Sequence, residues 1–340
     1  MVNPEAVYQF DGWLRFNGLY FTEVQGDVNP ESIFEDNDFT LYRGGAPNSP
    51  DEGYRRTDLA DHFEETGDLT GGLSNLAEDL VTYEYVSEKW VSVPAVDEGG
   101  EEHDESFQPK HRTIDIFWDY DDIMVFKGRK STIIDKQKDI RGGLAGDLRI
   151  EEVDFHFDFL LWLLYQSHLG NDLSSNLRLN SISDCKTVGA ATDSTVAVGG
   201  ESEVVRSVPF ITAILDGNKI DNLEGDFFLD STYIVAEIDS EGWTHVKASR
   251  EDMEKLSDLR QMGMAVQFVT ELLRLYEKWV KLDPEDQYPP QEFLEELVEL
   301  CEDEGYVPMR EPDELYDEYE QKRNGVIRGP KADYSLSKFE

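Results

Sequence analysis

Residues 259–280 read LRQMGMAVQFVTELLRLYEKWV, and this stretch indicates the fold class most clearly. Its apolar residues recur at alternating spacings of three and four positions: Leu259, Met262, Val266, Val269, Leu273, Tyr276 and Val280. That spacing predicts a long amphipathic α-helix. We expect Ser249 to cap its first turn, with Asp252 three residues later, and Asp283-Pro284 to end it.

The apolar seam of this helix has two interpretations. The helix packs against a sheet of its own chain, or it forms a coiled-coil contact in a homodimer through residues 259–280. A single helix of three heptads in a chain that also holds strands usually packs on its own sheet. The core interpretation is therefore favoured, and the homodimer remains the alternative.

Two hairpins are predicted upstream of this helix. Residues 113–118 and 123–126 have the composition of strands and flank an acidic turn at 119–122. Residues 233–238 are expected to pair in the same way with residues 243–247. Between the two hairpins, residues 155–168 carry leucines around Trp162, which suits a buried helix.

The C-terminal part is acidic and helical. After Pro289-Pro290, residues 291–304 carry an apolar stripe that predicts a docked helix. Residues 291–320 hold 13 acids and one base, Arg310, so the remaining surface of this part is expected to face solvent.

These patterns together predict an α+β fold in three parts. Residues 1–110 form a β-rich N-terminal domain, in which aromatic residues alternate with turn signals. Residues 111–283 form a mixed central domain that ends in the long amphipathic helix. Residues 284–340 form the acidic helical C-terminal segment and tail.

The charge of the chain points to salt adaptation. Its 340 residues include 73 Asp and Glu against 31 Lys and Arg, a formal net charge of −42. Disordered acidic chains lack aromatic residues, whereas 11% of this chain is aromatic. In molar salt the Debye length falls to about 3 Å, which screens the repulsion among the carboxylates. We therefore expect a protein of a halophilic archaeon.

The location expected from the sequence is the cytoplasm, with no membrane segment. The two cysteines, Cys185 and Cys301, lie far apart and form no CxxC pair, which fits a reducing compartment. The N-terminus has no basic and apolar leader. The longest apolar run, residues 159–165, is too short to cross a bilayer.

A basic segment departs from the overall charge. Residues 127–141 hold six bases against two acids, with Gly128 able to let the backbone approach a phosphate. The six candidate phosphate-binding or nucleic-acid-binding residues are Lys127, Arg129, Lys130, Lys136, Lys138 and Arg141. The alternative is that this loop pairs with acids of its own chain or of a partner.

A second basic patch lies near the C-terminus. Residues 322–331 carry four bases and no acid. The two patches share one surface only if tertiary packing brings residues 127–141 and 322–331 together.

A metal site is the other candidate. If residues 153–159 are extended, Asp154, His156 and Asp158 lie on one face and three phenylalanines on the other. Imidazole and carboxylates in this spacing could hold a divalent metal as a cofactor. The alternative is a half-buried strand with a polar outer face, in a chain where acids are frequent everywhere.

Three functional hypotheses follow. The first is a non-enzymatic accessory protein that contacts nucleic acid or a protein partner through residues 127–141. The second is a metal-dependent phosphoester hydrolase, with Asp154, His156 and Asp158 as ligands. The third is a structural or virion assembly component, with the helix 259–280 as the assembly contact. No GxxxxGK[ST], GxGxxG, HExxH or GxSxG motif is present, so enzymatic activity is left open.

Overall fold

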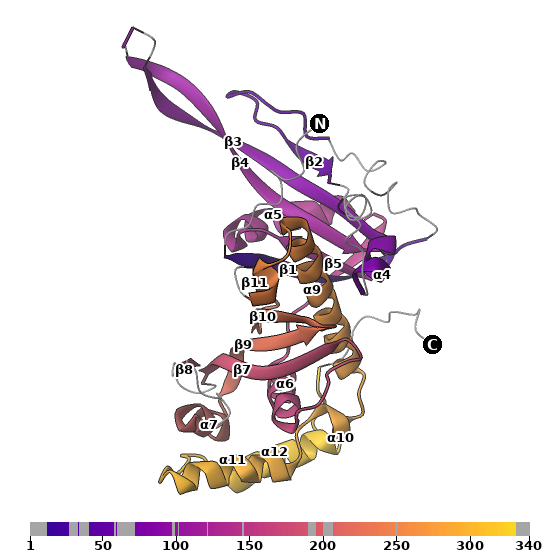
Figure 1. Cartoon of the computed structure of the whole chain (residues 1–340), viewed down its shortest axis with the longest axis vertical. Coiled ribbons are helices and arrows are strands. Elements are labelled where there is room, and N and C mark those ends of the chain that lie inside the picture. The colour runs from indigo at the N-terminus through magenta and orange to yellow at the C-terminus, as the bar shows by residue number, and fades with distance from the viewer. Residues whose placement is uncertain are drawn as a thin grey trace. The chain divides into compact units, whose positions relative to one another are not determined.

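The computed structural model describes residues 12–26, 33, 41–57, 59, 72–96, 99–100, 102–120, 122–144, 146–189, 195–199, 207–248 and 251–330. The strands are β1 (Trp13–Val24), β2 (Glu52–Arg56), β3 (Leu80–Val96), β4 (Glu102–Asp119), β5 (Ile123–Lys127), β6 (Leu148–Glu152), β7 (Leu177–Val188), β8 (Thr195–Gly199), β9 (Lys219–Leu229), β10 (Thr232–Asp239) and β11 (Thr244–Lys247). The helices are α4 (Gly72–Asp79), α5 (Lys130–Leu144), α6 (Phe157–Leu169), α7 (Val208–Leu215), α8 (Glu251–Glu254), α9 (Asp258–Val280), α10 (Pro284–Gln287), α11 (Gln291–Asp303) and α12 (Pro312–Arg323). The α+β class is confirmed, with strands richest in the N-terminal part and helices in the C-terminal part (Figure 1).

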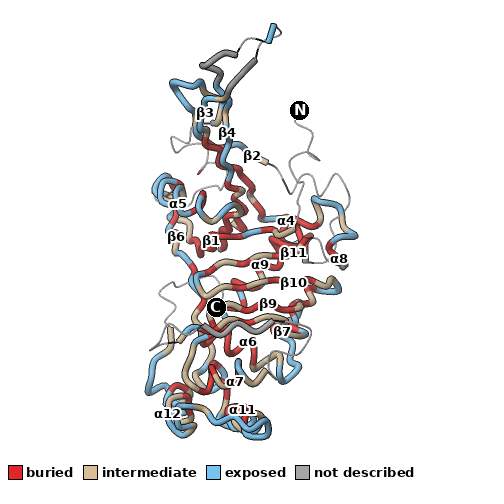
Figure 2. Tube along the Cα trace, turned by 90° about the vertical axis from the view of Figure 1, so that its left-hand side faces the viewer, coloured by how far each residue is buried: buried red, intermediate tan, exposed pale blue. Residues whose placement is uncertain are grey.

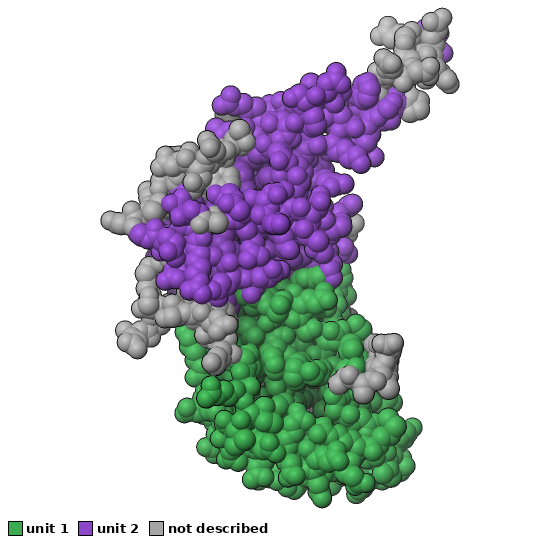
Figure 3. All heavy atoms as spheres, turned by 180° about the vertical axis from the view of Figure 1, so that it is seen from behind, with its two compact units in different colours: residues 1–14, 70–73, 153–340 green, residues 15–69, 74–152 purple. Residues whose placement is uncertain are grey.

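The chain forms two compact units (Figure 3). Unit 1 holds residues 1–14, 70–73 and 153–340, and unit 2 holds residues 15–69 and 74–152. This division differs from the boundaries expected at residues 110 and 283. Strand β4 runs through residue 110 without a break, because it pairs along its length with β3. The C-terminal helices likewise belong to the same unit as α9.

Unit 2 is an antiparallel sheet in the order β2-β3-β4-β5-β1, with β6 also paired to β1. The predicted hairpin over residues 113–126 is confirmed as β4 and β5, which pair from Asp115 opposite Lys127 to Asp119 opposite Ile123. Helix α5 packs on this sheet, and its buried Ile133, Ile140 and Leu144 join a core that includes Tyr20 and Trp118. Figure 2 shows this contrast between the buried strands and the exposed outer side of α5.

Strands β3 and β4 continue beyond the rest of the sheet of unit 2. They pair with each other from Leu80 opposite Asp119 to Val96 opposite Glu102. Strand β2 pairs with β3 only as far as Ser87, and β5 pairs with β4 only from Asp115. The outer parts of β3 and β4 therefore form a two-stranded ribbon, which Figure 1 shows projecting from the sheet.

Unit 1 contains the antiparallel strand order β11-β10-β9-β7-β8. The predicted hairpin over residues 233–247 is confirmed as β10 and β11. The predicted buried helix is confirmed as α6, which packs on β7 and β9. The predicted C-terminal helix is α11, whose buried Phe293, Leu294, Leu297 and Cys301 dock it in unit 1.

Helix α9 confirms the long helix of the apolar seam but begins later than expected. Its N-cap is Ser257, whose hydroxyl accepts the Arg260 N–H at 3.3 Å. The expected cap, Ser249, lies outside the described residues. The helix is also less amphipathic than predicted, because polar residues such as Gln267 and Thr270 are buried with the seam.

The seam of α9 packs inside its own unit. Phe268 contacts Phe227 of β9 with ring centroids 5.0 Å apart, and Tyr276 contacts Phe155 at 5.2 Å. From Met262 to Tyr276 every seam residue is buried. These contacts fit the core interpretation and leave no exposed apolar seam between Met262 and Tyr276 for a homodimer. Separately, no helix in the described residues has the length and apolar character needed to cross a membrane.

Candidate polyanion-binding site

The basic segment 127–141 is mostly helical rather than a loop. Lys127 ends β5, and residues 130–144 form α5. Gly142 and Gly143 also lie within this helix. The reason is the spacing of Ile133, Ile140 and Leu144, which places three apolar side chains on one face of the helix, against the sheet.

Three of the six predicted residues form ion pairs with acids of unit 2. Lys127 Nζ contacts Asp115 of β4, and Lys136 Nζ lies 2.8 Å from a Glu52 carboxylate oxygen. Arg141 lies 3.1 Å from Glu152. For these three residues, the structure supports the alternative that the basic segment pairs with acids of its own chain.

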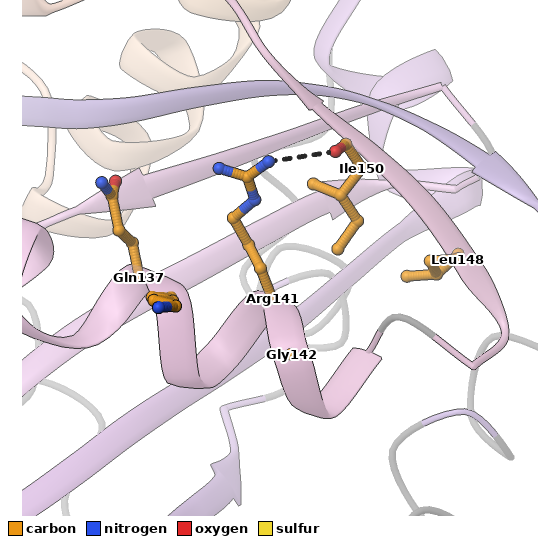
Figure 4. Close-up of a pocket in the computed structure, with 6 residues that line it drawn as sticks. Gln137, Arg141, Gly142, Leu148 and Ile150 are labelled. Carbon is orange, nitrogen blue, oxygen red and sulfur yellow. Dashed lines mark hydrogen bonds between the residues drawn. The ribbon is translucent and has the colours of Figure 1, made fainter.

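Arg141 lines a pocket of about 500 Å³ (Figure 4). The other residues that line this pocket are Gln137, Lys138, Gly142, Leu148 and Ile150. Its guanidinium donates to the Ile150 carbonyl at 3.3 Å. It also lies 5.3 Å from the centroid of the Tyr20 ring, a favourable cation–π distance. Arg141 therefore holds α5 and β6 together, and part of its donor capacity is already used.

The other three predicted residues, Arg129, Lys130 and Lys138, differ from these in exposure or in their partners. Arg129 and Lys138 are exposed, and neither forms a side-chain hydrogen bond or ion pair with any part of the chain that the structure describes. Lys130 is half-buried and has a partner within the chain. In a protein with more than twice as many acids as bases, two uncompensated cations on one short segment are unusual.

The ribbon adds cations that the sequence did not single out. Lys89 of β3 and Lys110 of β4 stand directly opposite each other, and both are exposed. Within the described residues neither has a hydrogen bond or ion pair. Like charges directly opposite on paired strands repel and destabilise the ladder. Sequence reasoning missed this pair because the two lysines become neighbours only through the register of β3 and β4.

Arg112 joins this face of the ribbon to α5. It lies two residues beyond Lys110 on β4, so its side chain is on the same face. Its guanidinium lies 3.2 Å from a carboxylate oxygen of Asp135 on α5. The segment that leads into α5 is close to β4, because a Cβ built on Gly128 would lie 3.2 Å from the carbonyl oxygen of Thr113 on that strand. We call Lys89, Lys110, Arg112 and Arg129 the basic ribbon surface.

The structure does not bring Asp154, His156 and Asp158 together as metal ligands. Asp154 is exposed, His156 is the extended N-cap of α6, and Asp158 is buried inside the first turn of that helix. The segment is therefore not a continuous strand with one polar face. Among the described residues, no group of three His, Cys, Asp or Glu side chains could hold a metal ion.

The ligand atoms of this segment are also occupied. Both carboxylate oxygens of Asp158 accept from Lys322 Nζ at 3.1 Å, and Tyr319 donates to one of them at 2.8 Å. His156 Nδ1 accepts the backbone N–H of Asp158 at 3.2 Å. A cation beside Asp158 would have to compete with the ammonium group of Lys322, so the donor set fits a divalent metal poorly.

The second basic patch is largely structural. Lys322 is buried, and Arg323 donates to the Tyr288 carbonyl, so both bases hold α12 in unit 1. Arg328 is exposed, and Lys331 lies outside the described residues.

Comparison with known protein families finds no match to this chain, and comparison with curated proteins finds none either. The chain is an α+β protein whose unit 2 presents a basic surface on a two-stranded ribbon and an adjoining helix.

Proposed function

We propose that the protein is a non-enzymatic accessory protein of a salt-adapted cell and binds nucleic acid through the basic ribbon surface. The observation that carries this proposal is the directly opposed pair Lys89 and Lys110, exposed and without acidic partners in the described residues of a chain with net charge −42. Such a pair costs folding stability. A phosphate group between the two ammonium groups would offset that cost.

The shape of the ribbon suits a duplex groove. A two-stranded antiparallel ribbon fits the major groove of B-DNA, which is about 12 Å wide. Pro94 and Pro109 lie in the outer parts of β3 and β4, and proline cannot donate a ladder hydrogen bond. Each proline removes one possible donor, which disfavours pairing with a further strand, so we expect contact through a face of the ribbon.

Charge along the ribbon limits where nucleic acid would sit. Residues 97–105 carry six acids and would repel phosphate. Binding is therefore expected at the base of the ribbon, where Arg112 lies two residues from Lys110 on β4, and Arg129 follows Gly128, which is close to Thr113 of the same strand. In molar salt diffuse attraction is screened, so affinity would depend on direct hydrogen bonds from these side chains to phosphate.

The test compares two triple variants with the same change in net charge. The first carries Lys89→Gln, Lys110→Gln and Arg129→Gln. The control carries Lys186→Gln, Lys255→Gln and Lys281→Gln, which removes three lysines of unit 1 that each pair with a carboxylate. Binding to labelled single-stranded and double-stranded DNA and RNA is measured over a series of KCl concentrations.

We expect the ribbon variant to lose binding and the control to keep it. If the ribbon variant retains residual binding, the slope of log K against log salt should fall by about three, one for each phosphate contact removed. Equal binding by the two variants, or no binding by the wild-type chain at any salt concentration, would refute the proposal.

A protein partner is the second candidate, and the opposite face of the ribbon favours it. Phe107 is 48% exposed there, next to the half-buried Trp90 and Pro109. This apolar face would be covered by another chain. If no nucleic acid binds, Phe107→Ser is the variant with which to test loss of a co-purifying protein, with Leu169→Ser on α6 as a control of similar exposure.

A further inference from the structure

Unit 1 contains an open groove of about 510 Å³ beside the N-terminus of α6. The residues that line it include His156 and Phe157 before and at the start of α6, Lys219 and Asp221 on β9, and Tyr276 on α9. None of these residues belongs to the basic ribbon surface. The groove therefore shares no residue with the proposed nucleic-acid site.

Lys219 is the uncompensated cation of the groove. It is exposed, and its Nζ lies 4.0 Å from the centroid of the Phe157 ring. It forms no hydrogen bond or ion pair with the described part of the chain. The nearby Asp221 does not neutralise it, because its two oxygens accept from Lys186 at 2.6 Å and from Ser240 at 3.0 Å.

Two further donors line the groove. His156 Nδ1 accepts a backbone N–H, so the proton of the neutral ring is on Nε2. Burial lowers the pKa of His156 against the opposing charge of Asp158, and the charges of Lys322 and Lys219 lower it further. The Tyr276 hydroxyl accepts the His156 backbone N–H at 3.3 Å, which leaves its own proton available for donation.

We propose that this groove binds a small molecule through a single oxyanionic group, a carboxylate or a phosphate, held by Lys219 with His156 Nε2–H and the Tyr276 hydroxyl as hydrogen-bond donors. The exposed Asp154 also lines the groove. Its charge disfavours a polyanion and favours a ligand with one anionic group. The segment for which the sequence suggested a metal cation is thus better suited to an anion, because Lys322 already neutralises Asp158 and Lys219 lines the groove without an acidic partner in the described residues.

The experiment uses the full chain with histidines labelled with ¹³C and follows the ring signal of His156 by NMR. The signal is assigned with His156→Asn, since asparagine retains the capping of α6. Inorganic phosphate and acetate are titrated separately at constant ionic strength. We expect a saturable shift of the His156 signal in the wild-type protein with at least one of the two probes.

Lys219→Gln should weaken this binding about tenfold or more, because a hydrogen bond to a charged group is lost. Lys255→Gln, which removes a lysine that pairs with Asp252 elsewhere in unit 1, should leave it unchanged. Response to phosphate alone identifies a phosphate ester as the ligand class, and response to acetate alone identifies a carboxylate. No saturable shift with either probe, or an equal response in Lys219→Gln, would overturn the proposal.

Discussion

Asp158 and Lys322 form an ion pair that is buried where helix α12 packs on helix α6. Lys322 Nζ also lies 4.3 Å from the centroid of the Tyr319 ring, and the Tyr319 hydroxyl donates to Asp158. Buried charges are costly to desolvate, and they are tolerated when partners satisfy them as these do. The pair is thus one of the contacts that dock α12, together with Arg323 and the buried Leu315 and Tyr319.

Breaking the pair on one side should destabilise the protein strongly. Lys322→Met leaves the Asp158 carboxylate buried without its cation, and we expect a loss of about 3–5 kcal/mol in the free energy of unfolding. Denaturant unfolding monitored by circular dichroism measures it.

Two further variants test whether burial of the charge causes that loss of stability. The double variant Asp158→Leu/Lys322→Met should recover much of the loss, because no buried charge remains. Lys281→Met removes the more exposed partner of Glu277 and should cost less than about 1 kcal/mol. Similar losses in Lys322→Met and Lys281→Met would show that burial does not decide the energy of the pair.

Glu88 organises the base of the ribbon through hydrogen bonds. It accepts from the Tyr42 hydroxyl at 2.5 Å, from the backbone N–H of Gly45 at 3.0 Å and from Trp90 Nε1 at 3.1 Å. These donors, Tyr42 foremost, lower the pKa of Glu88 from 4.5 to about 2. The ionised form is thus favoured in the folded protein.

The lowered pKa sets the direction of a pH effect. Because the folded pKa is below the unfolded pKa, the contribution of Glu88 to stability is complete above pH 4.5 and is lost as the pH falls through about 2. We expect Glu88→Gln to be less stable than the wild type at neutral pH. The difference should shrink between pH 4.5 and about 2, as measured by chemical unfolding at each pH. A constant difference across that range would contradict this account.

At the scale of elements, the β10–β11 turn depends on Gly242. Its φ of +79° is a conformation that L-residues with a side chain rarely adopt. A Cβ at this position would also lie 1.8 Å from the Val153 carbonyl oxygen. Gly305, which follows α11, has the same φ, but a Cβ there would meet nothing within 4 Å. The two glycines differ in surroundings, not in backbone conformation.

Alanine substitution at the two glycines should therefore distinguish the cost of backbone strain from the cost of a steric clash. Gly305→Ala is expected to cost about 1–2 kcal/mol, the energy of the left-handed conformation alone. Gly242→Ala should cost clearly more, because either the turn or the segment at Val153 must move. Thermal unfolding of the two variants measures the difference, and equal costs would show that the turn moves freely.

The start of α9 offers a second test at this scale. Ser257→Ala removes the side-chain oxygen that accepts the Arg260 N–H, with an expected loss of about 1 kcal/mol. Ser257→Gly should cost only a few tenths, since glycine is tolerated at an N-cap. Chemical unfolding distinguishes the two. If Ser249→Ala lowered the free energy of unfolding by about 1 kcal/mol and Ser257→Ala did not change it, Ser249 would be the cap, as the sequence predicted.

For the whole molecule, net charge is the dominant property. A net charge of −42 destabilises the folded state through self-repulsion in dilute buffer. Raising KCl from about 0.1 M to about 1 M shortens the Debye length from about 10 Å to about 3 Å. We expect the melting temperature to rise over this range, as measured by differential scanning calorimetry.

A neutral osmolyte provides the control for that effect. Sucrose stabilises compact states by exclusion from the surface but does not screen charge. At equal osmolality it should raise the melting temperature less than KCl does. Equal effects of the two solutes would mean that repulsion among carboxylates is not what limits the stability of this protein.

Local patterns in the sequence predicted several elements correctly. In α9 and α11 the apolar side chains recur with the period of a helix. In the two hairpins, short apolar segments flank a turn, which is typical of paired strands. The helix α5 was missed because its bases and glycines resembled a loop, although Ile133, Ile140 and Leu144 already had helical spacing. The proposed extended face at residues 154–158 did not form, since His156 instead caps a helix.

The sequence by itself therefore determined the α+β class and the local elements with strong apolar repeats, because these depend on neighbours along the chain. Tertiary structure alone decided which charges are compensated. Lys136 meets Glu52 and Lys322 meets Asp158 across long stretches of chain, whereas Lys89 and Lys110 are brought face to face by strand register. Coulomb energy depends on distance in space, and chain order does not fix that distance.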